Sequence, residues 1–214
     1  MSHPAHERTP YAVAARELLR TTLLDCARDE LQRRPWTQIS MADVAHAAGV
    51  SRQTLYNAFG SRADFAQAYV LREVDRFLAS VEEVVGEHLD DPPLALAAAL
   101  DMFLKSAAED PFVRSIIADD GSAGLLPLVT TGARPVIERA VERLSEIIRD
   151  GWPQVAAEDA GLLAELLVRL AISHAGLPTS TSSITATSLA RVLSPFIAQL
   201  LADAAGRLEL AAEI

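Results

Sequence analysis

The chain has 214 residues and a net charge of −10; half of its residues are hydrophobic and 5% are aromatic. This length supplies the core of one or two globular domains, and abundant Ala and Leu with few aromatics favour helices over sheets. No apolar run reaches the roughly 18 residues of a membrane-spanning helix, and none resembles a signal peptide. A single cysteine, Cys26, excludes an intrachain disulfide and a cysteine-based zinc site. We therefore expect a cytoplasmic protein.

The acidity is unevenly distributed. Residues 1–60 contain seven arginines and six acidic residues, whereas residues 61–214 carry a net charge of −11. A nearly neutral first part is compatible with DNA binding through a local patch, although the composition alone fits any acidic protein equally well.

The first part of the chain predicts a long helix, two short helices and a second long helix. Apolar residues recur at three- and four-residue spacing in the first one, which ends before Pro35 because a proline disfavours helical geometry in the residue before it. The predicted ranges are Ala12–Arg33, Met41–Ala48, Arg52–Phe59 and Arg62–Val85. Residues 1–10 are expected to form a mobile tail.

The second part predicts five more helices and no strand, so the expected fold class is all-α. The predicted ranges are Pro92–Ala108, Pro111–Ala118, Thr130–Arg149, Glu158–Ala175 and Ala186–Arg207. Two stretches rich in Gly, Ser, Thr or Asp are predicted loops, Asp119–Gly124 and Gly176–Thr185.

The segment Ser40–Arg62 has the pattern of a helix-turn-helix. Ser40 with Asp43, and Ser61 with Asp64, have the spacing of a capping box. Ser51 can cap the helix between them, and Gly49 suits the sharp turn that must precede it. Two short helices joined by a short turn that contains Gly define this motif.

The side chains of this segment separate by face. One set predicts a small shared core: Val44, Ala45, Ala48, Val50, Leu55 and Phe59. The opposite face of the second short helix carries Arg52, Gln53, Tyr56 and Asn57. Such a face can present donors and acceptors to the major groove of DNA, but a polar face that only meets solvent has the same pattern.

The segment resembles the DNA-binding domain of the TetR family of regulators. The matching runs are Ser40-Met41-Ala42-Asp43-Val44-Ala45, Ala48-Gly49-Val50-Ser51, Thr54-Leu55-Tyr56 and Phe59-Gly60-Ser61. The resemblance implies an N-terminal three-helix DNA-binding domain, residues 1–65. A long helix would join it to a C-terminal helical domain for ligand binding and dimerisation, residues 66–214. It further implies a homodimer that binds a near-palindromic operator, acts as a repressor and is released by a small hydrophobic molecule.

By position, the resemblance also implies a set of DNA contacts. Thr54, Tyr56 and Ser40 match places that contact phosphates, whereas Arg52, Gln53 and Asn57 match variable, base-reading places. Arg62 stands where Lys is more usual and keeps a phosphate-directed charge, and Ser51 completes the expected contact set. At positions 57 and 58 the family commonly has a basic residue or His, where this chain has Asn57 and Ala58.

The acidic C-terminal part offers candidate residues for dimerisation and for the ligand. Two chains could build a four-helix interface, although the same residues could form an internal core; the candidates are Leu162, Leu166, Leu170, Leu193, Phe196 and Leu200. Met102, Phe103 and Phe112 could line an apolar cavity or be plain core. His174 could offer that cavity a polar group or bond the last carbonyls of its helix.

Enzymatic activity is not expected. The chain has no metalloprotease, nucleophile-elbow or phosphate-loop motif and no clustered metal ligands, so we expect neither a metal nor a cofactor. A helical adaptor whose helix-turn-helix binds protein rather than DNA remains open at this point.

Overall fold

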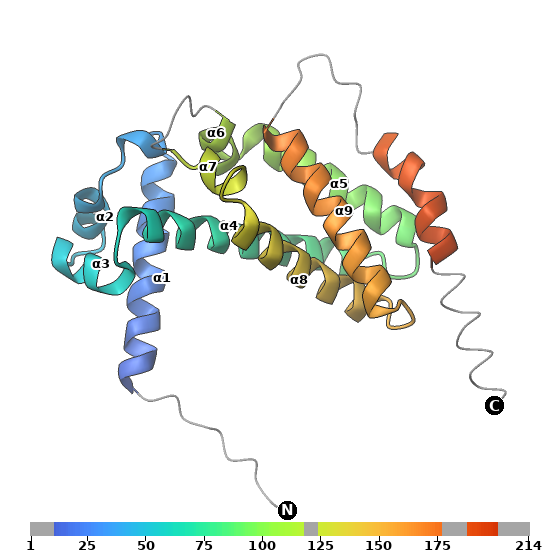
Figure 1. Ribbon diagram of the computed structural model, residues 1–214, viewed down its shortest axis with the longest axis horizontal. Helices are drawn as coiled ribbons and strands as arrows, with labels where there is room; N and C mark the ends of the chain where they lie inside the picture. Colours follow the sequence, from blue (N-terminus) through green and yellow to red (C-terminus); the bar gives the residue numbers. More distant parts are fainter. Residues whose placement is uncertain (1–10, 118–123, 177–187, 201–214) are drawn as a thin grey trace, which may run out of the picture. The chain divides into compact units, whose positions relative to one another are not determined.

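A computed structural model describes residues 11–117, 124–176 and 188–200, with the side chains of residues 107–108 and 174–176 outside the description (Figure 1). These ranges are helical and contain no strand, which confirms the expected all-α class. The chain divides into two compact units, Met1–Tyr69 and Val70–Ile214. No helix in the described ranges is long and apolar enough to cross a membrane.

The first unit packs short helices against one long one. It contains α1 (Tyr11–Leu31), a 3-10 turn η1 (Trp36–Gln38), α2 (Met41–Ala47), α3 (Arg52–Phe59) and the beginning of α4 (Arg62–Gly86). Both α2 and α3 pack against α1 and against each other. The fully buried side chains at their centre include Leu23, Val44, Leu55, Phe65 and Tyr69.

Buried aromatic rings pack against one another in the core of this unit. The Trp36 ring stacks on Tyr69, with centroids 5.3 Å apart, and on Phe65 at 6.2 Å. Phe59, at the end of α3, meets Phe65 edge to face at 4.9 Å. The turn η1 that presents Trp36 was not predicted, because its position is set by these distant aromatic partners rather than by a local pattern.

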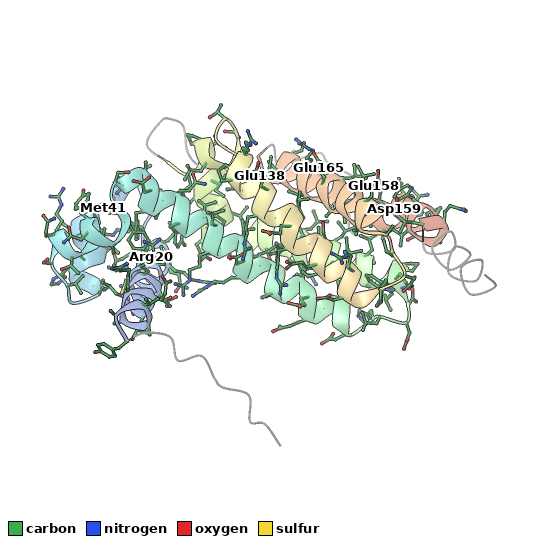
Figure 2. The ribbon with its side chains drawn as sticks, turned by 60° about the horizontal axis from the view of Figure 1, so that its bottom comes forward. Arg20, Met41, Glu138, Glu158, Asp159 and Glu165 are labelled. Carbon is green, nitrogen blue, oxygen red and sulfur yellow. The ribbon has the colours of Figure 1, made fainter. Side chains whose placement is uncertain are left out.

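The second unit is a stack of longer helices. It contains the rest of α4, α5 (Pro92–Glu109), α6 (Pro111–Ile117), α7 (Leu126–Val129), α8 (Arg134–Gly151), α9 (Ala157–Gly176) and a helix over residues 188–200. The pair α8 and α9 pack along each other, and α6 also contacts α9 (Figure 1). Glu158 and Asp159 lie at the start of α9, where the helix dipole favours negative charge (Figure 2).

Two apolar clusters hold the second unit together. One joins α4 to α8 and α9 through Leu78, Val81, Val85, Ala140, Ile147 and Val168. The other joins α5, α8, α9 and the 188–200 helix through Leu96, Ile148, Val155, Ala160, Leu163, Ala164 and Ile197. Ion pairs of Arg139 with Asp75, at 2.7 Å, and of Arg143 with Glu82 connect α8 to α4 at the surface.

Most predicted boundaries agree with the structure, and the differences have local causes. The helix predicted from Thr130 begins at Arg134, because a short α7 comes first and ends in a turn in which Gly132 donates to the carbonyl of Pro127 over 2.7 Å. Several predicted stretches lie outside the described residues: the tail 1–10, Ala118 at the end of one predicted helix, both predicted loops apart from Gly124 and Gly176, and residues 186–187 and 201–207 of the last predicted helix.

Candidate nucleic-acid interface

The capping signals read from the sequence form as predicted. At the start of α2, the Asp43 amide donates to the Ser40 hydroxyl over 3.2 Å, and the Ser40 amide donates to the Asp43 carboxylate over 2.8 Å. The Ser40 hydroxyl also donates to that carboxylate, over 2.7 Å. These bonds, with nearby Arg34, lower the pKa of Asp43, and the matching box of Ser61 lowers that of Asp64.

The turn between α2 and α3 is closed by backbone bonds. Gly49 has a φ of 67°, the left-handed conformation that favours glycine. Its amide donates to the carbonyl of His46 over 3.0 Å, and the amide of Val50 donates to that of Ala45 over 2.9 Å. This pair of bonds is the Schellman arrangement at a helix end. It turns the chain sharply, so that Ser51 caps α3 and Arg52 begins it.

The two faces of α3 separate as expected. Leu55 and Phe59 are buried, whereas Arg52, Gln53 and Asn57 are exposed. Of the remaining predicted core, Val44 and Ala45 are buried, and Ala48 and Val50 are half-buried.

The exposed side chains of α3 are ordered by hydrogen bonds one turn apart. Arg52 donates to the Tyr56 hydroxyl over 3.3 Å, and its guanidinium lies 5.3 Å from the centroid of that ring. Gln53 donates to the amide oxygen of Asn57 over 2.8 Å. All four residues predicted to face the groove thus belong to one polar surface, which we call the α3 face.

The Ser51 hydroxyl caps α3 beside this face, and the Thr54 hydroxyl is hydrogen-bonded to it. The Thr54 amide donates to the Ser51 hydroxyl over 3.0 Å, and the two hydroxyl oxygens lie 2.8 Å apart. Whichever hydroxyl donates within this pair, the other keeps its proton for an outside acceptor.

The end of α3 is held from α1 by Arg20, a residue that sequence reasoning missed. Its guanidinium lies 4.1 Å from the centroid of the Phe59 ring and donates to the carbonyl of Ala58. A lone arginine on the surface of a predicted helix gives no local signal for a partner 38 residues away. The contact follows only from the packing of α1 on α3.

Arg62, which the resemblance assigned to a phosphate, is bonded within the chain. The half-buried guanidinium donates to the carbonyls of Ile39, over 2.6 Å, and Trp36, over 3.2 Å. It also lies 5.4 Å from the centroid of the Trp36 ring. These contacts are with the chain itself, just before α2.

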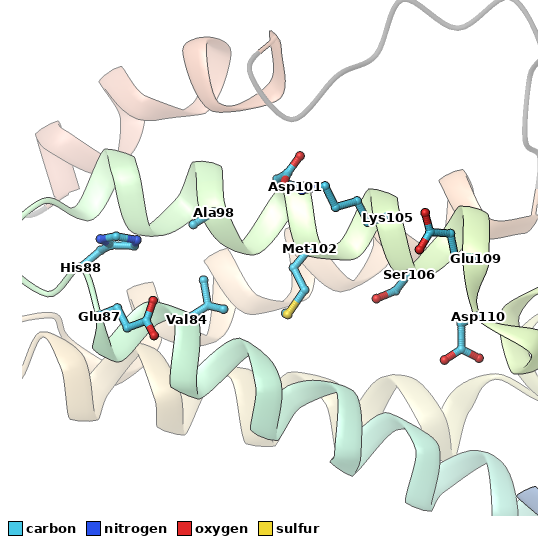
Figure 3. Close-up of a pocket in the computed structure, with 10 residues that line it drawn as sticks. All are labelled: Val84, Glu87, His88, Ala98, Asp101, Met102, Lys105, Ser106, Glu109 and Asp110. Carbon is cyan, nitrogen blue, oxygen red and sulfur yellow. Dashed lines mark ion pairs between the residues drawn. The ribbon is translucent and has the colours of Figure 1, made fainter.

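One candidate ligand residue of the second unit lines a groove. Met102 lies in the wall of an open groove of about 600 Å³ between the end of α4 and α5 (Figure 3). Its other walls are mainly polar, with Glu87, His88, Asp101, Lys105, Ser106, Glu109 and Asp110. Lys105 and Asp101 pair at 2.5 Å, which raises the pKa of that lysine.

Neither Phe103 nor Phe112 is among the residues that line this groove. Phe103 packs edge to face on Phe77, with ring centroids 6.0 Å apart. Phe112 is half-buried in α6, and its amide donates to the Asp110 carboxylate over 2.7 Å. The His174 side chain lies outside the described part of the structure. No group of three or more potential metal ligands occurs among the described residues.

The dimer candidates divide into outward and inward sets. Leu162 and Leu166 of α9 are 62% and 50% exposed, and Phe196 of the 188–200 helix is 54% exposed. Leu193 and Leu200 instead pack against the cluster around Leu163 and Ile197 inside the protomer, and Leu170 is half-buried. Val192, which the sequence analysis did not select, is 68% exposed.

Comparisons with known proteins agree with this architecture. Residues 23–69 match the model described as "Bacterial regulatory proteins, tetR family", and residues 91–195 match "Bacterial Tetracyclin repressor, C-terminal domain". The HTH-type transcriptional regulator AlkX of Mycobacterium tuberculosis is 40% identical over 190 residues, covering 89% of this chain and 90% of the relative. An uncharacterised HTH-type regulator of the same species is 32% identical over 95 residues, 44% of this chain and 46% of its own.

A solved structure supports the same assignment. The crystal structure of the TetR family repressor AlkX from Dietzia sp. strain DQ12-45-1b, implicated in biodegradation of n-alkanes, matches with a TM-score of 0.75 and 36% identity. The match covers 85% of this chain and 96% of that one. These relatives and domains are those of regulators rather than of enzymes. The chain belongs to the TetR family and is a DNA-binding transcriptional regulator.

Proposed function

We propose that the protein is a ligand-responsive repressor that binds a near-palindromic operator as a homodimer in the cytoplasm. The observation that carries this proposal is the α3 face, an ordered row of polar side chains over a buried apolar one. A helix of this kind can enter the major groove, and two such helices in a twofold dimer read two related half-sites. Regulation then requires a molecule that favours one conformation of the dimer over another.

Within the α3 face we assign base reading to Arg52, Gln53 and Asn57, whose polar groups are exposed. Arginine pairs well with guanine, and side-chain amides pair well with adenine. Tyr56 and Thr54 are assigned to phosphates, which hydroxyl groups commonly contact.

Ser40 and Ser51, the caps of α2 and α3, are both assigned to phosphates, but their hydroxyl groups differ in how free they are to donate. The Ser51 and Thr54 pair keeps one hydroxyl proton for a phosphate oxygen. The Ser40 hydroxyl already donates to Asp43, whose negative charge also repels a phosphate. Ser40 is therefore the weakest member of the proposed contact set. We propose to leave Arg62 out of this set, because its guanidinium donates to two carbonyls of the chain itself.

Dimerisation is assigned to the apolar surface of α9 and the 188–200 helix. Leu162 and Leu166 lie one turn apart, as do Val192 and Phe196, and all four expose large apolar side chains. Exposed apolar groups of this kind mark contact surfaces in regulators that work as pairs. Leu166→Glu is expected to yield monomers in analytical ultracentrifugation, whereas Leu162 and Phe196 changed to Met are expected to preserve the dimer. If the Leu166→Glu variant remained dimeric, the dimer interface would have to lie on another surface.

The ligand is proposed to be a small hydrophobic molecule, by analogy with the Dietzia relative implicated in n-alkane biodegradation. The apolar layer between α4, α5 and α8, which contains Phe77, Met102 and Val81, supports such a ligand better than the polar groove does. A panel of medium-chain alkanes, alcohols and fatty acids is to be screened for a raised melting temperature and weakened DNA binding. No effect from any of them would contradict the sensor proposal.

The first experiment is binding of the purified protein to the DNA that flanks its own gene, measured by fluorescence anisotropy at about 50 and 200 mM salt, because phosphate contacts make affinity fall steeply with salt. We expect competitor-resistant binding with two chains per site. A selection from random DNA extends the search to distant operators. Failure of both experiments would favour the helical adaptor that the sequence alone left open.

A further inference from the structure

Arg62 holds together the two ends of the helix-turn-helix. The motif runs from the cap of α2 at Ser40 to the cap of α4 at Ser61, and Arg62 is the residue that follows it. The guanidinium reaches back to the carbonyl of Ile39, the residue that precedes the motif, over 2.6 Å. Ile39 and Arg62, the two residues that flank this segment of 22 residues, are thereby joined by a charge-assisted hydrogen bond.

Four further contacts hold the stretch 36–39 and the start of α2. Arg62 donates to the carbonyl of Trp36 over 3.2 Å, and its guanidinium lies 5.4 Å from the centroid of the Trp36 ring. Arg34 donates to the carbonyl of Gln38 over 3.2 Å and lies 3.3 Å from the Asp43 carboxylate. Two arginines therefore fix consecutive carbonyls of the stretch 36–39 that leads into α2.

We propose that Arg62 is a positioning residue for DNA binding, which sets the orientation of α2 and α3 by closing the base of the motif and does not itself contact a phosphate. The planar fork of arginine is needed for this task, because it donates to two carbonyls while its face covers an indole. A lysine could supply the charge but not two fixed bonds and a flat face.

The proposal rests on DNA binding through α3, and salt dependence separates it from a phosphate contact. Each phosphate neutralised by a cationic side chain contributes about 0.9 to the slope of log K against log salt on duplex DNA. Loss of a positioning residue weakens binding and leaves that slope unchanged.

The test compares full-length Arg62→Gln and Arg62→Lys with Arg52→Gln, the matched control that removes a guanidinium from the α3 face. The probe is a duplex enriched from random sequences by the wild-type protein. We expect both Arg62 variants to bind roughly tenfold more weakly, the factor for about one charge-assisted bond, with the wild-type slope. Arg52→Gln, which removes a side chain assigned to base reading, is expected to change the preference at one base pair, whereas both Arg62 variants keep the wild-type preference.

Stoichiometric titration measures the fraction of active molecules, so that affinity is compared among folded proteins only. A role confined to stability would lower that fraction and leave the dissociation constant of the active molecules unchanged, which would overturn the proposal. So would a slope lowered by about 0.9 in Arg62→Gln together with wild-type affinity in Arg62→Lys. If Arg62→Gln does not fold, the affinity of Arg62→Lys decides between the two roles. This variant retains the positive charge, so weaker binding supports positioning and wild-type binding supports a phosphate contact. Failure of the wild-type protein to select any duplex would instead count against the proposed function.

Hydrogen exchange supplies an independent readout. We expect the amides of residues 41–59 to exchange faster in Arg62→Lys than in the wild type, while those of α8 in the other unit keep their rates. Unchanged exchange in residues 41–59 would contradict the positioning role.

Discussion

The side-chain amide of Gln53 donates to the amide oxygen of Asn57 over 2.8 Å, one turn further along α3. This bond leaves the Asn57 amide group as a donor and the Gln53 oxygen as an acceptor on the exposed side of the helix. A donor beside an acceptor is the pattern that pairs with the major-groove edge of adenine. Under the proposed function, Gln53 and Asn57 would read one base pair together, and their mutual hydrogen bond is already formed without DNA.

The first prediction concerns this pair. Asn57→Ala is expected to change the preference among operator variants at one base pair by about 1–3 kcal/mol, the value of a good side-chain contact to a base. Tyr56→Phe removes a hydroxyl assigned to a phosphate and is expected to weaken binding to all sequences alike. Both effects are measured by competition among operator duplexes that differ at single positions. Equal effects of the two variants on every duplex would refute this division of roles.

The second prediction concerns the turn of the motif. Gly49 has a φ of 67°, and a Cβ built on it would meet nothing within 4 Å, so a substitution there is opposed by backbone strain alone. Gly49→Ala is expected to destabilise the first unit by about 1–2 kcal/mol in urea denaturation, the cost of a left-handed conformation for alanine. Gly49→Asn is expected to cost less, because asparagine tolerates this region.

Gly161 is the matched control for Gly49. It lies inside α9, and a Cβ there would also meet nothing within 4 Å. Gly161→Ala is expected to stabilise the second unit by about 0.4–1 kcal/mol, since alanine loses less entropy in a helix. An equal loss of stability in both alanine variants would contradict backbone conformation as the cause of the effect at Gly49.

Local signals predicted much of the fold and of the site. The capping boxes, the glycine turn and the polar face of α3 depend on residues within a few positions of each other, and all of them form. The inward turn of Arg62 and the contact of Arg20 with Phe59 depend on partners more than twenty residues away. No pattern in the sequence specifies such partners.

The dimer candidates show a second limit. An apolar residue on a helix is suited equally to the protomer's own core and to an interface, and only the packing of the helix decides. In the 188–200 helix, Leu193 faces the cluster inside the protomer while Val192 and Phe196 remain exposed. The apolar pattern therefore located the helices and left the rotation about their axes undetermined.

The third prediction concerns acid. The pKa of Asp43 is lowered by hydrogen bonds from Ser40, and that of Asp64 by hydrogen bonds from Ser61. A carboxylate with a depressed pKa in the folded state contributes stability above its unfolded pKa and loses it as pH falls through the folded pKa. The first unit is therefore expected to lose stability progressively below about pH 4.

Trp36 reports on this unit once Trp152→Phe removes the other of the chain's two tryptophans. Urea denaturation followed by its fluorescence is expected to show a weaker acid dependence in Asp43→Asn and Asp64→Asn. Asp43→Glu, which keeps a carboxylate at the third helical position, is the control and is expected to retain the dependence. If all three variants retained the full acid dependence of stability, titratable groups other than Asp43 and Asp64 would be its cause.

The last prediction concerns Cys26, the single cysteine of the chain. Burial raises the pKa of this thiol, and the negative charges of Asp29, Asp25 and Glu30 raise it further. Since the thiolate is the reactive form, alkylation by iodoacetamide is expected to be slower than for a cysteine in urea-unfolded protein and to keep rising beyond about pH 8.5. Asp29→Asn removes one of the charges and is expected to speed the reaction near neutral pH. A rate that is already constant between about pH 7 and 8.5 would mean an ionised thiol and would contradict the environment seen around Cys26.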